Sequence, residues 1–199
     1  MERNRQSFGF LDLDQLEPNP FFLCDFGIQK RNEKSYYYHN LNRGNYEGFV
    51  FQYTLHGCGI YEEEGLKYQL TEQSAFMTPV PYNSCYYFSD EYDRDWEFFY
   101  LHFQGTAAKT LYEKIHKLYG NCFFLDRHST SVQLFMKEYE EVQAGKLYGR
   151  YEGSLFLHTF LISLLKDLER IDLYLQDVIT AFDLKQSGTL FVIAGGVLN

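Results

Sequence analysis

The sequence that decides the fold is QSAFMTPVPYNSCYYFSDEYDRDWEFFYLHF, which runs from Gln73 to Phe103. Its pattern of small apolar, aromatic and turn-forming residues predicts three short strands, at Ser74–Thr78, Ser84–Phe88 and Trp96–Phe103. Proline cannot donate a hydrogen bond within a sheet, so Pro79 and Pro81 predict a turn over Val80–Asn83. A charged loop separates the two aromatic strands.

The chain before this stretch also consists of strands and turns. In Gly48–His56, Phe49, Phe51, Tyr53 and Leu55 alternate with Val50, Gln52, Thr54 and His56, so each set faces one side of a strand. Further strands are predicted at Phe21–Ile28, Ser35–His39, Ile60–Tyr61 and Leu66–Leu70. Many short strands joined by turns are typical of a sandwich or a barrel.

The order of these segments resembles a known family. A strand, a Pro-x-Pro turn, a Tyr-rich strand, a charged loop and Trp-x-Phe-Phe-Tyr-Leu-His-Phe-x-Gly follow the strand and turn of Gly48–Gly59. Over roughly residues 20–170 this order is similar to the effector-binding domain of AraC-family bacterial transcription regulators. The resemblance implies a β-rich α+β fold, in which a cupin-type jelly-roll barrel encloses one small-molecule cavity and C-terminal helices pack on it.

The expected organisation has four parts: an N-terminal arm at 1–20, the barrel at 21–105, a helical dimerisation segment at 106–170, and a linker or truncated tail at 171–199. The resemblance implies an arm that folds over the ligand, and a loosely ordered terminus is the alternative. Asp172–Phe182 resembles the helix that leads to the family's DNA-binding domain. No helix-turn-helix pattern follows, so the chain was cut short, or the gene is truncated or frameshifted.

Helical periodicity begins after Gly105. One helix is predicted from Thr106 to Gly120, and Asn121–Leu125 is a short apolar run with strand character. Thr130–Gln133 has the pattern of a capping box that opens a second helix.

A third helix is predicted from about Tyr151 to Arg170, and its apolar stripe must be buried. One interpretation is that the stripe packs on the barrel. The other is a seam between two subunits, because Leu157, Leu161, Leu164 and Leu168 keep coiled-coil spacing. The resemblance favours a homodimer, since members of this family commonly dimerise through helices in this place.

Composition restricts the function of the chain. It has 199 residues, 45% of them hydrophobic, which is enough for a folded core and excludes wholesale disorder. The net charge of −9 repels a phosphate backbone, so we expect this chain to reach DNA only through a helix-turn-helix domain that it lacks. The longest apolar run, Leu190–Leu198, is too short to span a bilayer, and no membrane partner is expected.

The four cysteines are far apart, without a Cys-x-x-Cys pair, and are Cys24, Cys58, Cys85 and Cys122. The N-terminus lacks the apolar segment of a secretory signal peptide. We therefore expect reduced thiols in a cytoplasmic protein.

The sequence argues against an enzyme. The six histidines never fall at the spacing of metal ligands, so no metal site, catalytic residue or cofactor is expected. Gly-x-Ser-x-Gly and phosphate-loop motifs are absent. His56 and His102 are interpreted as polar residues near strand ends.

The candidate ligand-binding residues come mainly from one strand. Alternation in Trp96–Phe103 places Trp96, Phe98, Tyr100 and His102 on one face. The resemblance adds Tyr87, at the position of a pocket tyrosine, and Arg43, near the position of a loop arginine. The family member that binds arabinose has His and Trp where this chain has Phe98 and Tyr100, which argues against arabinose. Aromatic faces with hydroxyl and guanidinium donors suit a sugar, and an aromatic barrel core is the alternative.

These observations predict a ligand-sensing and dimerisation domain of an AraC-type transcription regulator, with a sugar or sugar derivative as its small-molecule effector. A metal-dependent cupin enzyme, an isomerase or dioxygenase, is the alternative. A ligand-free oligomerisation module is the third possibility, favoured if the barrel interior is filled.

Overall fold

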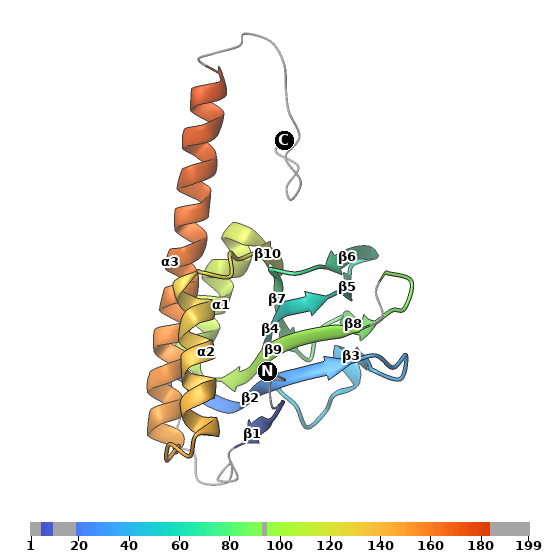
Figure 1. Cartoon of the computed structure of the whole chain (residues 1–199), viewed down its shortest axis with the longest axis vertical. Coiled ribbons are helices and arrows are strands. Elements are labelled where there is room, and N and C mark those ends of the chain that lie inside the picture. Colours follow the sequence, from blue (N-terminus) through green and yellow to red (C-terminus); the bar gives the residue numbers. More distant parts are fainter. Residues whose placement is uncertain (1–4, 10–18, 93–94, 184–199) are drawn as a thin grey trace.

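The computed structural model describes residues 5–9, 19–92 and 95–183 and contains two antiparallel sheets (Figure 1). The larger sheet has the strand order β1-β2-β9-β4-β7-β10. Its strands are β1 (Ser7–Gly9), β2 (Phe22–Arg31), β9 (Trp96–Gln104), β4 (Gly48–Gly57), β7 (Ser74–Val80) and β10 (Cys122–Phe124). The smaller sheet has the order β3-β8-β5-β6, with β3 (Tyr37–His39), β8 (Ser84–Phe88), β5 (Gly59–Glu63) and β6 (Leu66–Leu70). Each strand expected from the sequence is present, within a few residues of the predicted bounds.

Side-chain alternation divides the larger sheet between two hydrophobic cores. The barrel core lies between the sheets and contains Val50, Tyr61, Leu70, Phe76, Val80, Tyr86, Phe88, Trp96, Phe98 and Tyr100. The helix-side core holds the opposite residues of the same strands, among them Phe51, Phe99 and Leu101. The predicted faces of β4 and β9 are therefore confirmed.

Three helices cover the outer face of the larger sheet, α1 (Thr106–Tyr119), α2 (Thr130–Gln143) and α3 (Arg150–Asp183) (Figure 1). The two helices predicted on either side of residue 171 form one continuous helix, α3. The end of α3 extends past the sheets (Figure 1). Among the described residues, no helix combines the length and apolarity that crossing a membrane requires.

The leucine stripe of α3 is used inside the chain. Leu157, Leu161, Leu164 and Leu168 are all buried in the helix-side core. They are therefore not available as a seam between subunits, and the structure supports the interpretation that the stripe packs on the barrel. The large apolar residues exposed on α3 lie on its other faces and include Tyr151, Leu155, Ile162 and Leu173.

The predicted capping box at Thr130–Gln133 is wrong. The side chain of Gln133 instead donates to the carbonyl oxygen of Arg127. The start of α2 is capped from α3, where Asp167 accepts hydrogen bonds from the backbone N–H and the hydroxyl of Ser131, at 2.7 and 2.8 Å. A buried carboxylate at a helix N-terminus satisfies unpaired N–H groups and the helix dipole, which fixes α2 against α3.

The N-terminal arm adds the edge strand β1 to the larger sheet, where Ser7 pairs with Gly27 on β2. A Cβ atom at Gly27 would lie 2.5 Å from the carbonyl oxygen of Gln6, so only glycine permits this approach. The backbone N–H of Gln6 donates to the hydroxyl of Tyr139 on α2 at 2.8 Å. Residues 10–18, which belong to the expected arm, lie outside the described residues, as does the tail from residue 184.

Strand β7 continues past its predicted end at Thr78, through Pro79, as far as Val80. Pro79 pairs with Phe49 of β4, whereas β10, on the other side of β7, pairs only as far as Phe76. At Pro79 the strand therefore has a single neighbour, a position that tolerates a missing N–H. The turn starts later than predicted, after Val80.

Candidate functional site

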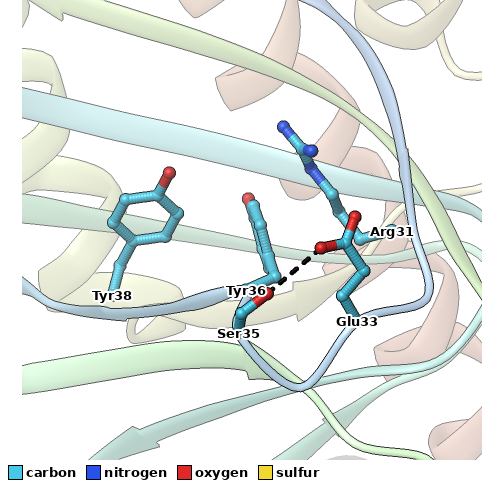
Figure 2. Close-up of a pocket in the computed structure, with 5 residues that line it drawn as sticks. All are labelled: Arg31, Glu33, Ser35, Tyr36 and Tyr38. Carbon is cyan, nitrogen blue, oxygen red and sulfur yellow. Dashed lines mark hydrogen bonds between the residues drawn. The ribbon is translucent and has the colours of Figure 1, made fainter.

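A pocket of about 180 Å³ lies at the connection between β2 and β3 (Figure 2). It is lined by Arg31, Glu33, Ser35, Tyr36 and Tyr38. The guanidinium of Arg31 and the hydroxyls of Tyr36 and Tyr38 extend to the same side of the backbone (Figure 2). Glu33, Ser35 and Tyr38 are exposed, so the pocket opens to solvent.

The pocket rests on the barrel core. The ring of Tyr36 lies 5.7 Å from Phe98 and 6.0 Å from Trp96, measured between ring centroids. Beneath Tyr36 the aromatic side chains of the barrel core fill the space between the sheets. Trp96 and Phe98 are almost fully buried there. The indole N–H of Trp96 donates to the hydroxyl of Thr54 at 3.0 Å, which satisfies the polar atom of this ring.

A row of arginine guanidinium groups and aromatic rings in contact with one another extends away from the pocket, and we call it the Arg–Tyr row. Its members are Arg31, Tyr36, Tyr38, Arg43, Tyr46 and His102, with successive separations of 5.0, 5.1, 4.5, 3.8 and 3.6 Å, measured to or between ring centroids. Guanidinium groups stacked on tyrosine rings gain cation–π attraction. The row therefore links the pocket to the opposite end of β9.

Within the row, Arg43 makes both stacking and hydrogen-bond contacts with other side chains of the chain. Its guanidinium lies between the rings of Tyr38 and Tyr46 and donates to the hydroxyl of Tyr86 at 2.6 Å. Arg43 thus joins the loop before β4 to β8 of the smaller sheet.

His102 ends the row in a hydrogen-bonded cluster. Its Nδ1 atom lies 3.0 Å from a carboxylate oxygen of Asp25, and its Nε2 atom lies 2.9 Å from the carbonyl oxygen of Glu47. Both partners are acceptors, so the two hydrogen bonds form together when both ring nitrogens carry a proton. The hydroxyl of Tyr46 also donates to Asp25, and this closes the cluster.

Five of the six predicted ligand-binding residues lie in the barrel core or along the row. They are Arg43, Trp96, Phe98, Tyr100 and His102. The sixth, Tyr87, is on the other face of β8 and donates to Glu62 at 2.7 Å. Its neighbour Tyr86 faces the interior instead, because adjacent strand residues point to opposite sides.

Sequence reasoning missed the pocket residues Arg31, Tyr36 and Tyr38. The available signal was the run of three tyrosines at 36–38, which begins five positions after Arg31. Asp25, the partner of His102, carried no signal because its role depends on pairing between β2 and β9.

The described residues show no group of three or more His, Cys, Asp or Glu side chains that could hold a metal ion. His56, one of the two histidines considered, is exposed and lies 2.6 Å from a carboxylate oxygen of Glu72. His102 has both ring nitrogens engaged within the cluster described above.

A family model for the AraC-like ligand-binding domain matches residues 29–160. The chain belongs to this family. The match includes the pocket, the Arg–Tyr row and most of the helix-side core. A search of curated proteins gives no match.

The chain is also similar to solved structures. The AraC-like transcriptional activator CuxR superposes with a TM-score of 0.51 at 9% identity, over 77% of this chain and 54% of that one. ToxT from Vibrio cholerae, with an unsaturated fatty acid bound, gives 0.43 at 15% identity, over 78% and 57%. A cupin superfamily protein from Desulfitobacterium hafniense gives 0.32 at 12% identity, over 52% and 81%.

This chain therefore spans about half the length of the CuxR and ToxT chains. At such low identity the likeness to CuxR bears on the fold, and the predicted cupin-like barrel with C-terminal helices is confirmed.

Burial changes the acidity of the interior tyrosines. It raises the pKa of Tyr86 from 10.0 to about 12, although the adjacent Arg43 guanidinium opposes the shift. Burial, followed by the nearby Asp25 carboxylate, also raises the pKa values of Tyr46 and Tyr100. The folded state thus favours the neutral phenols.

This shift predicts how stability depends on pH. The folded pKa of Tyr86 exceeds the unfolded one, so its contribution is complete below about pH 10 and is lost as the pH rises through about 12. Tyr86→Phe removes the ionising group. When the pH is raised from about 9 to about 11, the free energy of unfolding should therefore fall by about 1 kcal/mol less in the variant than in the parent. Urea unfolding followed by circular dichroism measures this difference.

Tyr92→Phe, which changes an exposed ring in the loop before β9, is the control and should follow the parent. Parallel pH profiles for Tyr86→Phe and the parent would show that Tyr86 is not buried as described.

Proposed function

We propose that this AraC-like domain is the cytoplasmic sensor of a transcription regulator and binds a sugar or sugar derivative at the pocket beside β3. The observation that supports this most is the pocket itself, where tyrosine hydroxyls and a guanidinium lie over an aromatic floor. Ring faces suit the C–H surface of a sugar, and the polar tips suit its hydroxyls.

In this proposal the barrel core is the floor of the site and its residues need not all touch the ligand. Trp96 and Phe98 support Tyr36, and Arg43 supports Tyr38. Binding would regulate transcription by favouring one arrangement of the surrounding elements over another. The Arg–Tyr row, which connects the pocket to β2 and β9, supplies a contact path for such a change.

The filled barrel core favours a second candidate, an oligomerisation module without an effector. The two candidates differ in whether any small molecule stabilises the fold, and this can be measured directly.

Thermal unfolding of the chelator-treated chain should be measured with neutral sugars, sugar acids and sugar phosphates, and separately with Mn, Fe and Zn salts. A ligand at about 100 times its Kd stabilises a fold by about 2.7 kcal/mol, which raises Tm visibly. We expect a sugar or sugar derivative to raise Tm, and Tyr36→Leu to abolish the rise. A rise with one metal alone would support a cupin enzyme, and no rise at all would support the ligand-free module.

We also propose that the domain forms a homodimer through the outer face of α3. The exposed residues Tyr151, Leu155, Ile162 and Leu173 repeat at intervals of whole or nearly whole helical turns, so they lie on one side of the helix. We propose this exposed face as the dimer interface in place of the leucine stripe suggested by the sequence, because those leucines are buried within the chain.

Sedimentation velocity tests the dimer. The parent chain should sediment as a dimer, and the double variant Leu155→Asp/Ile162→Asp as a monomer, because two charges would be buried in the seam. Leu118→Asp, at an exposed position on α1, is the matched control and should remain dimeric. A monomeric parent, or a dimer that survives the double variant, would refute this interface.

A further inference from the structure

The two arginines of the Arg–Tyr row differ in how well the protein satisfies them. Arg43 has a ring on each side and a short hydrogen bond to Tyr86. Arg31 stacks on one ring, that of Tyr36, and donates from Nη2 to the side chain of Gln29 at 2.9 Å. Its Nε atom is shielded from solvent and has no hydrogen-bond partner within the described part of the chain. Arg31 is thus the incompletely satisfied cation of the pair.

Among the described residues Arg31 also lacks a carboxylate partner, although the chain is rich in carboxylates. The chain carries 27 acidic and 18 basic residues, so carboxylates are plentiful. Most Lys and Arg ion pairs of the described residues are on the surface, for example Lys34 with Asp90 at 2.9 Å in the same turn as the pocket. Arg31 forms no such pair with any described carboxylate, although its guanidinium extends along the pocket wall (Figure 2). A half-buried guanidinium without a counter-ion is suited to an anionic ligand.

The other lining groups indicate what accompanies the anion. Tyr36 and Tyr38 present hydroxyls beside the guanidinium (Figure 2). Glu33, whose carboxylate accepts a hydrogen bond from the Ser35 hydroxyl at 3.1 Å, supplies an acceptor. A simple anion would be repelled by Glu33, whereas an anion that also carries hydroxyl groups can donate to it. At about 180 Å³ the pocket is smaller than the roughly 300–1,000 Å³ of drug-sized sites, so it suits one sugar ring.

We propose that Arg31 binds the carboxylate or phosphate of an acidic monosaccharide, while Glu33 accepts hydrogen bonds from its hydroxyls. This inference rests on the proposed sugar-binding function and narrows its ligand class. Guanidinium groups form paired hydrogen bonds with both kinds of anion, so uronic acids and sugar phosphates share the chemistry. Arg43 then has a supporting role, because its guanidinium stacks on the rings of Tyr38 and Tyr46 and donates to Tyr86.

Isothermal titration calorimetry on the full chain tests this with matched pairs: glucuronate and glucose 6-phosphate against glucose, and galacturonate against galactose. Acetate and inorganic phosphate test the anion alone. At least one acidic sugar should bind about ten- to a hundredfold more tightly than its neutral parent, as expected for a charge-assisted contact. The better of glucuronate and glucose 6-phosphate identifies the anionic group.

Variants identify the residue. Arg31→Gln should remove the preference for the acid and leave the weak affinity for the neutral sugar, and Arg31→Lys should retain part of the preference because it keeps the charge. Lys34→Gln, which removes one positive charge from the same turn outside the pocket, should bind as the parent does. Glu33→Gln should weaken binding of the acidic sugar and, because it removes the repulsion, should strengthen any binding of inorganic phosphate.

The outcomes separate this inference from the function on which it rests. If a neutral sugar binds as tightly as its acid, or if Arg31→Gln keeps the acid preference, the inference is wrong and the sugar sensor stands. If no sugar of either kind binds, both are wrong. If inorganic phosphate binds as tightly as the acidic sugar, the site takes simple anions and the assignment to sugars fails.

Discussion

The fold depends on the alternation of side chains along β9. This strand pairs with β2 on one side and β4 on the other, so each of its residues faces one of the two cores. Phe99 and Leu101 enter the helix-side core, while Trp96 and Phe98 enter the barrel core. A slip of one residue would exchange the two sets. Because each buried ring contributes about 1.5–3 kcal/mol, few alternative registers can compete.

That alternation explains why the fold could be predicted from the sequence. Period-two patterns identified the strands, and a period of about 3.6 identified the helices, since both depend only on neighbours along the chain. The errors came from tertiary contacts. Asp167 on α3, far from α2 in sequence, supplies the cap expected from Thr130–Gln133. Pro79 fits within β7 because β10 stops short of it.

The candidate site was less predictable, for a similar reason. Tyr87 was chosen where Tyr86 faces the interior, which is a shift of one residue that inverts the face of a strand. Periodicity showed that the stripe containing Leu157 is buried, but could not say whether the covering surface belongs to the same chain. The pocket needs Arg31 and Tyr38 to approach each other across a turn, and no local pattern encodes that geometry.

Aromatic rings fill the barrel core, and the proposed ligand site lies above them. Trp96 is the only tryptophan, and its buried indole lies beside the rings of Tyr36 and Phe98. The fluorescence of Trp96 therefore tests most directly whether the barrel interior is filled. We expect emission typical of an apolar environment, weak quenching by acrylamide, and little change in quenching when an effector occupies the pocket. Emission typical of water, with efficient quenching that an effector suppresses, would show an open barrel cavity and contradict the account.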